Sequence, residues 1–213
     1  MTLERRLFRD EVHTTLRREI VTGVLPAGAV LRDGDLAARF GTSKEPIRSA
    51  LQRLRAEGLV DTRPQSGTRV ALLDEAAALD ALELVRTLSI RAAELALPRL
   101  ADSHLEAMTD ANDRFEAAAS AGDLDAALTA DDDFHDVLLA LAGNTALVRV
   151  VHQQSDVLRR LELAQFGLDG GTSSGARHRR FVAACAARDL PLVRDLTAQV
   201  WSSLADHLSK GTA

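Results

Sequence analysis

Residues 36–56 read LAARFGTSKEPIRSALQRLRA, and this stretch decides the fold of the N-terminal part of the chain. The apolar residues at its start predict a short helix over residues 33–40, which the tight turn GTS ends. Ser43 is a suitable N-cap, and Pro46 falls in the first turn of the next helix, where its missing N–H does no harm. A second helix is therefore expected over residues 44–56.

The flanking sequence completes a small domain around these two helices. Residues 4–22 carry an apolar residue at every fourth position from Phe8 to Ile20, which predicts an amphipathic helix. After Gly58, the segments LVDTR and TRVALL predict two short strands joined by a turn over residues 64–67. Three helices followed by a two-stranded hairpin is the order of a winged helix-turn-helix.

From residue 74 onward the sequence is typical of amphipathic helices. They are expected at residues 74–98, 102–120, 123–141, 145–166, 174–187 and 189–209. The stretch GLDGGTSSG, residues 167–175, is the expected flexible loop of this half. The predicted fold class is mainly α, with a winged helix-turn-helix over residues 1–73 and an all-α bundle of about six helices over residues 74–213.

Charge is divided unevenly between these two parts. Residues 1–73 carry 13 Lys+Arg and 9 Asp+Glu, whereas residues 74–213 carry 13 and 22, within a net charge of -5. A basic N-terminal part (the head, residues 1–73) joined to an acidic remainder favours nucleic-acid binding by the head. The one cysteine, Cys185, excludes an internal disulfide framework, and no apolar run reaches the ~20 residues of a membrane span. The N-terminus is charged and does not resemble a signal peptide. Together these features predict a cytoplasmic protein that does not bind membranes.

The helix expected over residues 44–56 has the properties of a DNA-reading helix. Its outer face carries Lys44 and Arg48 one turn apart, and a helix of this size fits the major groove, where arginine can contact guanine bidentately. The hairpin tip can reach a neighbouring groove. The expected DNA contacts are Arg32, Ser43, Lys44, Glu45, Arg48, Gln52, Gln65, Ser66 and Gly67. The alternative is an ordinary surface helix with a solvated charged face, which the turn, the hairpin and the domain charge together disfavour.

The acidic half contains a candidate pair of metal ligands within the sequence ADDDFH. Asp131 and His135 are four residues apart, a rotation of ~400° on a helix, so their side chains share a face and can bind one ion. A carboxylate oxygen with an imidazole nitrogen suits a divalent metal such as zinc, nickel or manganese. Taken alone this spacing is a weak signal, because such pairs are common on helix surfaces.

These motifs together resemble a known family. The segments GVLPAGAVL (residues 23–31), LAARFGTSKEPIRSAL (36–51) and EGLV (57–60) are similar to the GntR-type winged helix-turn-helix. The helical remainder resembles the FCD-type ligand-binding domain of the FadR subfamily. The resemblance implies a bacterial, cytoplasmic, homodimeric transcription repressor that binds a double-stranded, palindromic DNA operator. A small-molecule effector, expected to be a carboxylate, would control its operator affinity from the helical domain.

The recognition helix departs from the family pattern. Members usually read Ser-Arg-Thr-Pro-Val-Arg where this chain reads SKEPIR from Ser43 to Arg48. Lysine lacks the bidentate fork of arginine, and Glu45 can accept a hydrogen bond from cytosine N4. Glu45 could instead compensate the helix dipole in the first turn. We therefore expect an operator that differs from the usual one.

The resemblance also implies the position of an effector or metal site. The FCD pattern supplies Asp and His from one helix, matched by Asp131 and His135, and one His from each of two later helices. His178 matches the first of these, whereas the second falls at Val200, which is apolar. Three protein ligands plus water or effector can hold a metal, and the alternative is a metal-free pocket whose side chains bind the effector directly. Arg86 would clamp a carboxylate effector, unless it is an exposed helix arginine.

Two other functions are compatible with parts of the sequence. A constitutive DNA-binding regulator with a degenerate effector pocket gains support from Val200 at the expected ligand position. A metal-dependent enzyme would need an activated nucleophile or an acid–base pair beside the ion, and the sequence offers only Asp132 and Asp133. The sequence therefore predicts a ligand-responsive DNA-binding regulator and not an enzyme.

Overall fold

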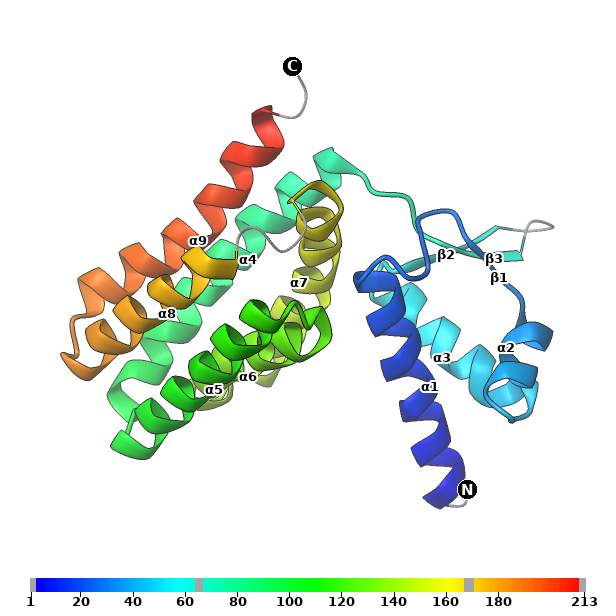
Figure 1. Ribbon diagram of the computed structural model, residues 1–213, viewed down its shortest axis with the longest axis horizontal. Coiled ribbons are helices and arrows are strands. Elements are labelled where there is room, and N and C mark those ends of the chain that lie inside the picture. Colours follow the sequence, from blue (N-terminus) through cyan, green and yellow to red (C-terminus); the bar gives the residue numbers. More distant parts are fainter. Residues whose placement is uncertain (1–2, 64–66, 167–170, 211–213) are drawn as a thin grey trace. The chain divides into compact units, whose positions relative to one another are not determined.

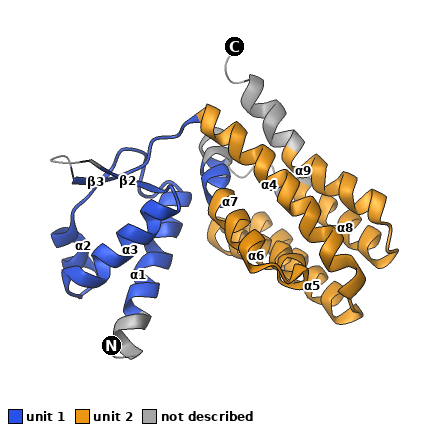
Figure 2. Ribbon diagram, turned by 180° about the vertical axis from the view of Figure 1, so that it is seen from behind, with its two compact units in different colours: residues 1–74, 156–164 blue, residues 75–155, 165–213 orange. Residues whose placement is uncertain are grey.

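The computed structural model describes residues 3–63, 67–166 and 171–210. The chain forms two compact units, one made of residues 1–74 with 156–164 and one of residues 75–155 with 165–213 (Figure 2). The division near residue 74 lies where the sequence changes character. Nothing in the sequence indicates that residues 156–164 belong to the N-terminal unit.

The first unit contains the helices α1 (Leu3–Val21), α2 (Asp33–Arg39) and α3 (Lys44–Ala56) (Figure 1). The apolar residues at every fourth position of α1 and those on the inner face of α3 form one core. Leu16, Ile20, Ile47 and Leu54 are buried in it. Burial of this stripe is what holds α3 in place, because an isolated 13-residue helix is marginal in water. The outer face of α3 is left exposed.

A small antiparallel sheet follows the helices. It consists of β1 (Val30–Leu31), β2 (Val60–Arg63) and β3 (Gly67–Val70) in the order β1-β3-β2. Val60 pairs with Val70 and Arg63 with Gly67, which gives the expected hairpin. The two-residue strand β1 was not predicted, since so short a segment has no periodicity and is defined only by its pairing with β3.

Residues 156–164 of α7 pack within the first unit. Val157 contacts its apolar core, and the buried Asp156 forms an ion pair with Arg17. The buried Arg160 donates a 2.8 Å hydrogen bond to the carbonyl of Ala71, and burial lowers the pKa of its guanidinium. These polar contacts satisfy charges that would otherwise be costly to bury.

The second unit is helical, as predicted. Its elements are α4 (Glu75–Ala96), a 3-10 turn (Leu97–Arg99), α5 (Asp102–Ala121), α6 (Leu124–Ala142), α7 (Thr145–Phe166), α8 (Gly171–Ala186) and α9 (Leu190–Lys210). Met108, Phe134, Cys185 and Val193 lie in its core. Burial raises the pKa of the Cys185 thiol to about 11, so this cysteine is a protonated core residue.

The prediction of a loop over residues 167–175 is wrong for residues 171–175. Residues 167–170 lie outside the described part of the chain, but α8 begins at Gly171, so residues 171–175 are helical. The glycine at 175 is explained by packing, because a Cβ there would lie 2.7 Å from the Cγ and Cδ atoms of Glu116 on α5. Among the described helices, none is both long and apolar enough to cross a membrane.

Candidate functional site

The exposed face of α3 presents the side chains expected to read DNA. Ser43, Lys44, Glu45, Arg48 and Gln52 are exposed, whereas the opposite face of the helix is buried. Ser43 is the N-cap residue in extended conformation, but its hydroxyl makes no capping hydrogen bond. The N-terminal turn of α3 therefore combines exposed cations with the helix N–H groups, an arrangement suited to phosphates and base edges.

Arg48 is held by an acidic residue of the preceding helix. Its Nε donates to Asp33 Oδ2 at 2.8 Å, and this hydrogen bond raises the pKa of the Arg48 guanidinium. Because both side chains are partly exposed, the pair orients Arg48 without burying it.

The other predicted DNA contacts lie before α2 and at the hairpin. Arg32 is exposed, and its Nη1 atom lies 3.7 Å from Asp35 Oδ2. Gly67 begins β3 at the hairpin, while Gln65 and Ser66 lie outside the described residues.

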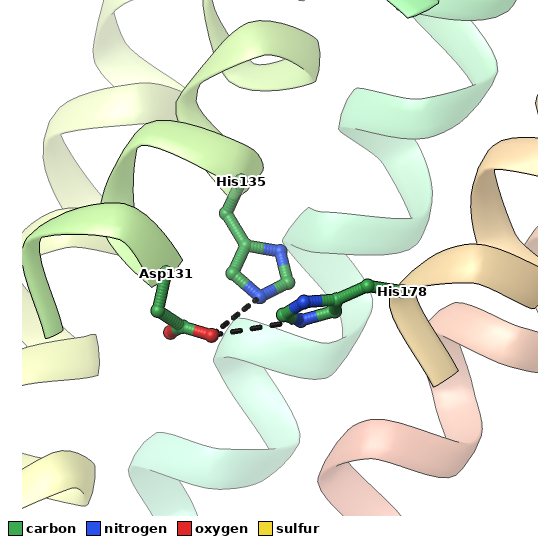
Figure 3. A group of neighbouring side chains, drawn as sticks. All are labelled: Asp131, His135 and His178. Atoms are coloured by element: carbon green, nitrogen blue, oxygen red, sulfur yellow. Dashed lines mark ion pairs between the residues drawn. The ribbon is translucent and has the colours of Figure 1, made fainter. Parts of the chain in front are cut away.

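A second cluster lies in the helical unit. Figure 3 shows Asp131 and His135 projecting from neighbouring turns of α6 toward His178 of α8. Each residue offers one ligand atom, and these atoms all lie within 4.8 Å of one another. Asp131 Oδ1 is 3.5 Å from His178 Nε2 and 3.8 Å from His135 Nε2. The structure thus brings together three residues from two helices that are far apart in sequence.

His178 is the most enclosed member of this cluster. Its ring stacks on Phe134 with a centroid distance of 4.0 Å, and only 5% of the residue is exposed. Burial, together with the nearby His135, lowers the pKa of His178 to about 4. At neutral pH the imidazole is therefore neutral, the form in which histidine binds metals and accepts hydrogen bonds.

The two remaining predicted effector residues lie on other helices of this unit. Arg86 is an exposed residue of α4, and Val200 is a half-buried residue of α9. Within the described part of the chain, the group of metal-ligating side chains consists of Asp131, His135 and His178. Roles for Arg86 and Val200 in an effector site stay predictions.

Sequence reasoning missed Asn112, which is buried beside the cluster on α5. Its Oδ1 atom lies 2.9 Å from His178 Nδ1. The only signal in the sequence is a polar residue at a core position, between the buried Ala111 and Phe115. That pattern marks a buried polar contact but does not indicate its partner.

Comparison with known proteins identifies both halves of the chain. Residues 8–70 match the family of bacterial regulatory proteins called gntR, and residues 80–203 match the FCD domain. The chain belongs to the GntR family, with an FCD domain. The expected family and the expected fold class, a winged helix-turn-helix followed by a helical bundle, are thereby confirmed.

Individual relatives agree with this assignment. A probable transcriptional repressor of a D-xylose utilization operon from Paenarthrobacter nicotinovorans is 32% identical over 69% of this chain and 65% of its own length. An HTH-type transcriptional regulator from Streptomyces ambofaciens is 30% identical over 89% of this chain and 80% of its own. The structure of E. coli McbR/YncC shares the fold, with a TM-score of 0.84 at 18% identity over 97% of this chain and 99% of that chain.

These similarities decide between the functional classes considered above. The matched families and relatives are DNA-binding transcriptional regulators, so this GntR-family chain is a transcriptional regulator and not an enzyme. The FCD match over residues 80–203 covers most of the helical unit, together with residues 156–164 of the first unit.

Proposed function

We propose that this GntR-family regulator is a cytoplasmic repressor whose operator affinity is set by a small carboxylate bound at the Asp131–His135–His178 cluster. The observation that supports this most directly is the convergence of one carboxylate and two imidazoles inside the FCD domain. A neutral buried imidazole and a carboxylate in one place form a polar site that a ligand or ion can complete.

The donor set of the cluster fits a divalent metal. Asp131, His135 and His178 would hold zinc, nickel or manganese with one oxygen and two nitrogen ligands. Such an ion would supply a Lewis-acidic position for a carboxylate oxygen of the effector. Because Val200 occupies the fourth position implied by the family pattern, we expect weaker metal binding than in a site with four protein ligands. Arg86 is the proposed second contact of the effector carboxylate.

On the DNA side, we propose that a homodimer binds a palindromic double-stranded operator. Two-fold symmetry of the protein would be matched by two half-sites, each read by one copy of α3. The proposed contacts of each copy are Arg32, Ser43, Lys44, Glu45, Arg48, Gln52, Gln65, Ser66 and Gly67. The Lys44–Glu45 pair would distinguish this operator from the usual one of the family.

Genome-wide mapping of binding sites followed by effector titration tests this function. The mapped operator is placed on a fluorescent duplex, and small carboxylates suggested by the neighbouring genes are added with and without Zn²⁺. Release of the protein by one of them would support the proposal. Unchanged operator affinity in the presence of every carboxylate, with or without Zn²⁺, would favour a constitutive regulator with a degenerate pocket.

A further inference from the structure

A hydrogen-bonded chain links α5 to α8 directly behind the cluster. Asn112 of α5, which is 2% exposed, donates from Nδ2 to Glu116 Oε1 at 3.2 Å. Its Oδ1 faces His178 Nδ1 at 2.9 Å. Glu116 in turn forms an ion pair with Arg179 of α8. The Asn112 amide therefore stands between a carboxylate and the buried imidazole.

The carboxylate fixes which way this amide points. An ionised Glu116 can only accept hydrogen bonds, so the amide nitrogen of Asn112 must face it. The amide oxygen is then directed at His178 Nδ1, and an oxygen of this kind can only accept. It follows that Nδ1 of His178 carries the proton and that Nε2 carries the lone pair.

This choice of tautomer decides what the cluster can bind. With the proton on Nε2, His178 would donate toward Asp131 Oδ1, which is 3.5 Å away. The two side chains would then form a hydrogen-bonded pair. With the proton on Nδ1, the Nε2 lone pair faces the carboxylate oxygen of Asp131. Two electron-rich atoms face one another only at a cost, unless a cation or a donor group lies between them.

We propose that Asn112 is a positioning residue that holds His178 in the Nδ1–H tautomer, so that Nε2 is kept as a ligand atom beside Asp131 and His135. This inference rests on the proposed function of the cluster, because it assigns to Asn112 the task of keeping that site open to a cation. A metal-bound histidine commonly donates its other ring N–H to such an outer partner, which sets its orientation.

The packing of α8 on α5 supports the same assignment. Gly175 lies one turn before His178, and a side chain at 175 would collide with Glu116. The absence of a Cβ at this position lets the Glu116 carboxylate stay where it anchors the Asn112 amide. Both hydrogen-bond partners of Asn112 thus depend on α8: His178 belongs to it, and Glu116 forms an ion pair with its Arg179.

Two variants of the full chain separate the positioning role from simple packing. Asn112→Leu keeps the approximate shape but removes the acceptor. The double variant Asn112→Asp with Glu116→Gln reverses the inner pair, because the new amide at position 116 would donate to the new carboxylate at position 112, which still accepts from His178 Nδ1. The readouts are the imidazole ¹⁵N chemical shifts of His178 in metal-free protein and the affinity for Zn²⁺ by calorimetry.

We expect the metal-free wild type and the double variant to show the Nδ1–H tautomer. Asn112→Leu should shift His178 toward Nε2–H and bind Zn²⁺ about 10- to 100-fold more weakly, while the double variant stays near wild type. A wild-type His178 protonated at Nε2 would overturn the inference, as would a Zn²⁺ affinity unchanged by Asn112→Leu in a folded protein. If Asn112→Leu does not fold, the wild-type and double-variant spectra still decide.

The same experiment distinguishes failure of the inference from failure of the proposed function. A wild type that shows the Nδ1–H tautomer but binds no Zn²⁺ would reject the metal and support the positioning role of Asn112. A wild type that binds Zn²⁺ with His178 in the Nε2–H tautomer before metal addition would reject the positioning role and support the metal.

Discussion

At the scale of single residues, burial and hydrogen bonding determine the chemistry of both sites. His178 is neutral because it is enclosed by Phe134 and lies close to His135, and the carboxylate of Asp131 offsets only part of this effect. Arg48 is charged and oriented by Asp33 at the surface of the head. His178 can thus accept a hydrogen bond, and Arg48 can donate one.

The depressed pKa of His178 predicts a loss of stability in mild acid. Its pKa is about 4 in the folded protein, against 6.5 ordinarily, so the unfolded chain takes up the proton first as pH falls. The free energy of unfolding should decrease between pH 6.5 and pH 4 by up to about 3 kcal/mol from this residue. Besides burial, His135 and Arg177 lower the pKa of His178, and Asp131 raises it.

Urea unfolding of wild type and His178→Gln across this pH range measures the effect. The difference between the two proteins should shrink toward pH 4, since the glutamine cannot be protonated. His152→Gln is the control, because His152 is exposed and pairs with Asp136 on the surface. Parallel pH curves for wild type and His178→Gln would show that His178 is not buried in its neutral form.

Arg48 should account for much of the sequence specificity. Arg48→Ala removes an exposed cation from the face of α3 that is expected to enter the groove, and one good base contact contributes ~1–3 kcal/mol. Arg53→Ala is the matched control, since Arg53 pairs with Asp10 and Glu57. Footprinting should show lost protection for Arg48→Ala alone. A wild-type footprint from Arg48→Ala would exclude α3 as the reading helix.

At the scale of elements, the sequence was informative where a local rule and packing agree. The N-cap position of Ser43 and the four inner residues of α3 define that helix almost to the residue. Strand β1 was missed because it depends on a partner that is distant in sequence. The start of α8 at Gly171 was also missed. The glycines near 175 indicate a loop by local rules, whereas Gly175 serves the contact between α8 and α5.

Gly175→Ala should behave unlike other helix glycine substitutions. Alanine favours a helix over glycine by up to about 1 kcal/mol, but at 175 it would displace the Glu116 side chain. We expect no gain in melting temperature and weaker Zn²⁺ binding, because Asn112 loses its anchor. Gly34→Ala in α2, where a Cβ would meet only the Lys44 side chain at 4.0 Å, is the control and should be neutral or stabilising. A stabilised Gly175→Ala with unchanged Zn²⁺ affinity would refute this role of the glycine.

The candidate site could be predicted only in part. The spacing of Asp131 and His135 places them on one face of α6 by helix geometry alone. His178 required the family pattern, because nothing local links α8 to α6. Neither helix geometry nor the family pattern predicted Asn112, because its partner is set by the packing of α5 against α8. Residues that act through tertiary contacts cannot be read from periodicity.

At the scale of the whole molecule, charge and symmetry should govern DNA binding. The basic N-terminal part and the acidic remainder differ in sign, so the head should be the part drawn to phosphates. Operator affinity should therefore fall steeply with salt, since each phosphate contact releases counterions. Binding titrations across a salt series measure the slope, and a flat response would contradict a phosphate-based interface.

We propose that the Asp131–His135–His178 cluster controls the affinity of the head for its operator. The most direct measurement compares operator affinity with and without effector for wild type, Asp131→Asn and His178→Ala. Asp136→Asn serves as the control, because Asp136 also lies on α6 but pairs with the exposed His152. We predict that the effector weakens operator binding of wild type and Asp136→Asn and leaves the two cluster variants bound. An equal response of all four proteins would show that the cluster does not control operator affinity.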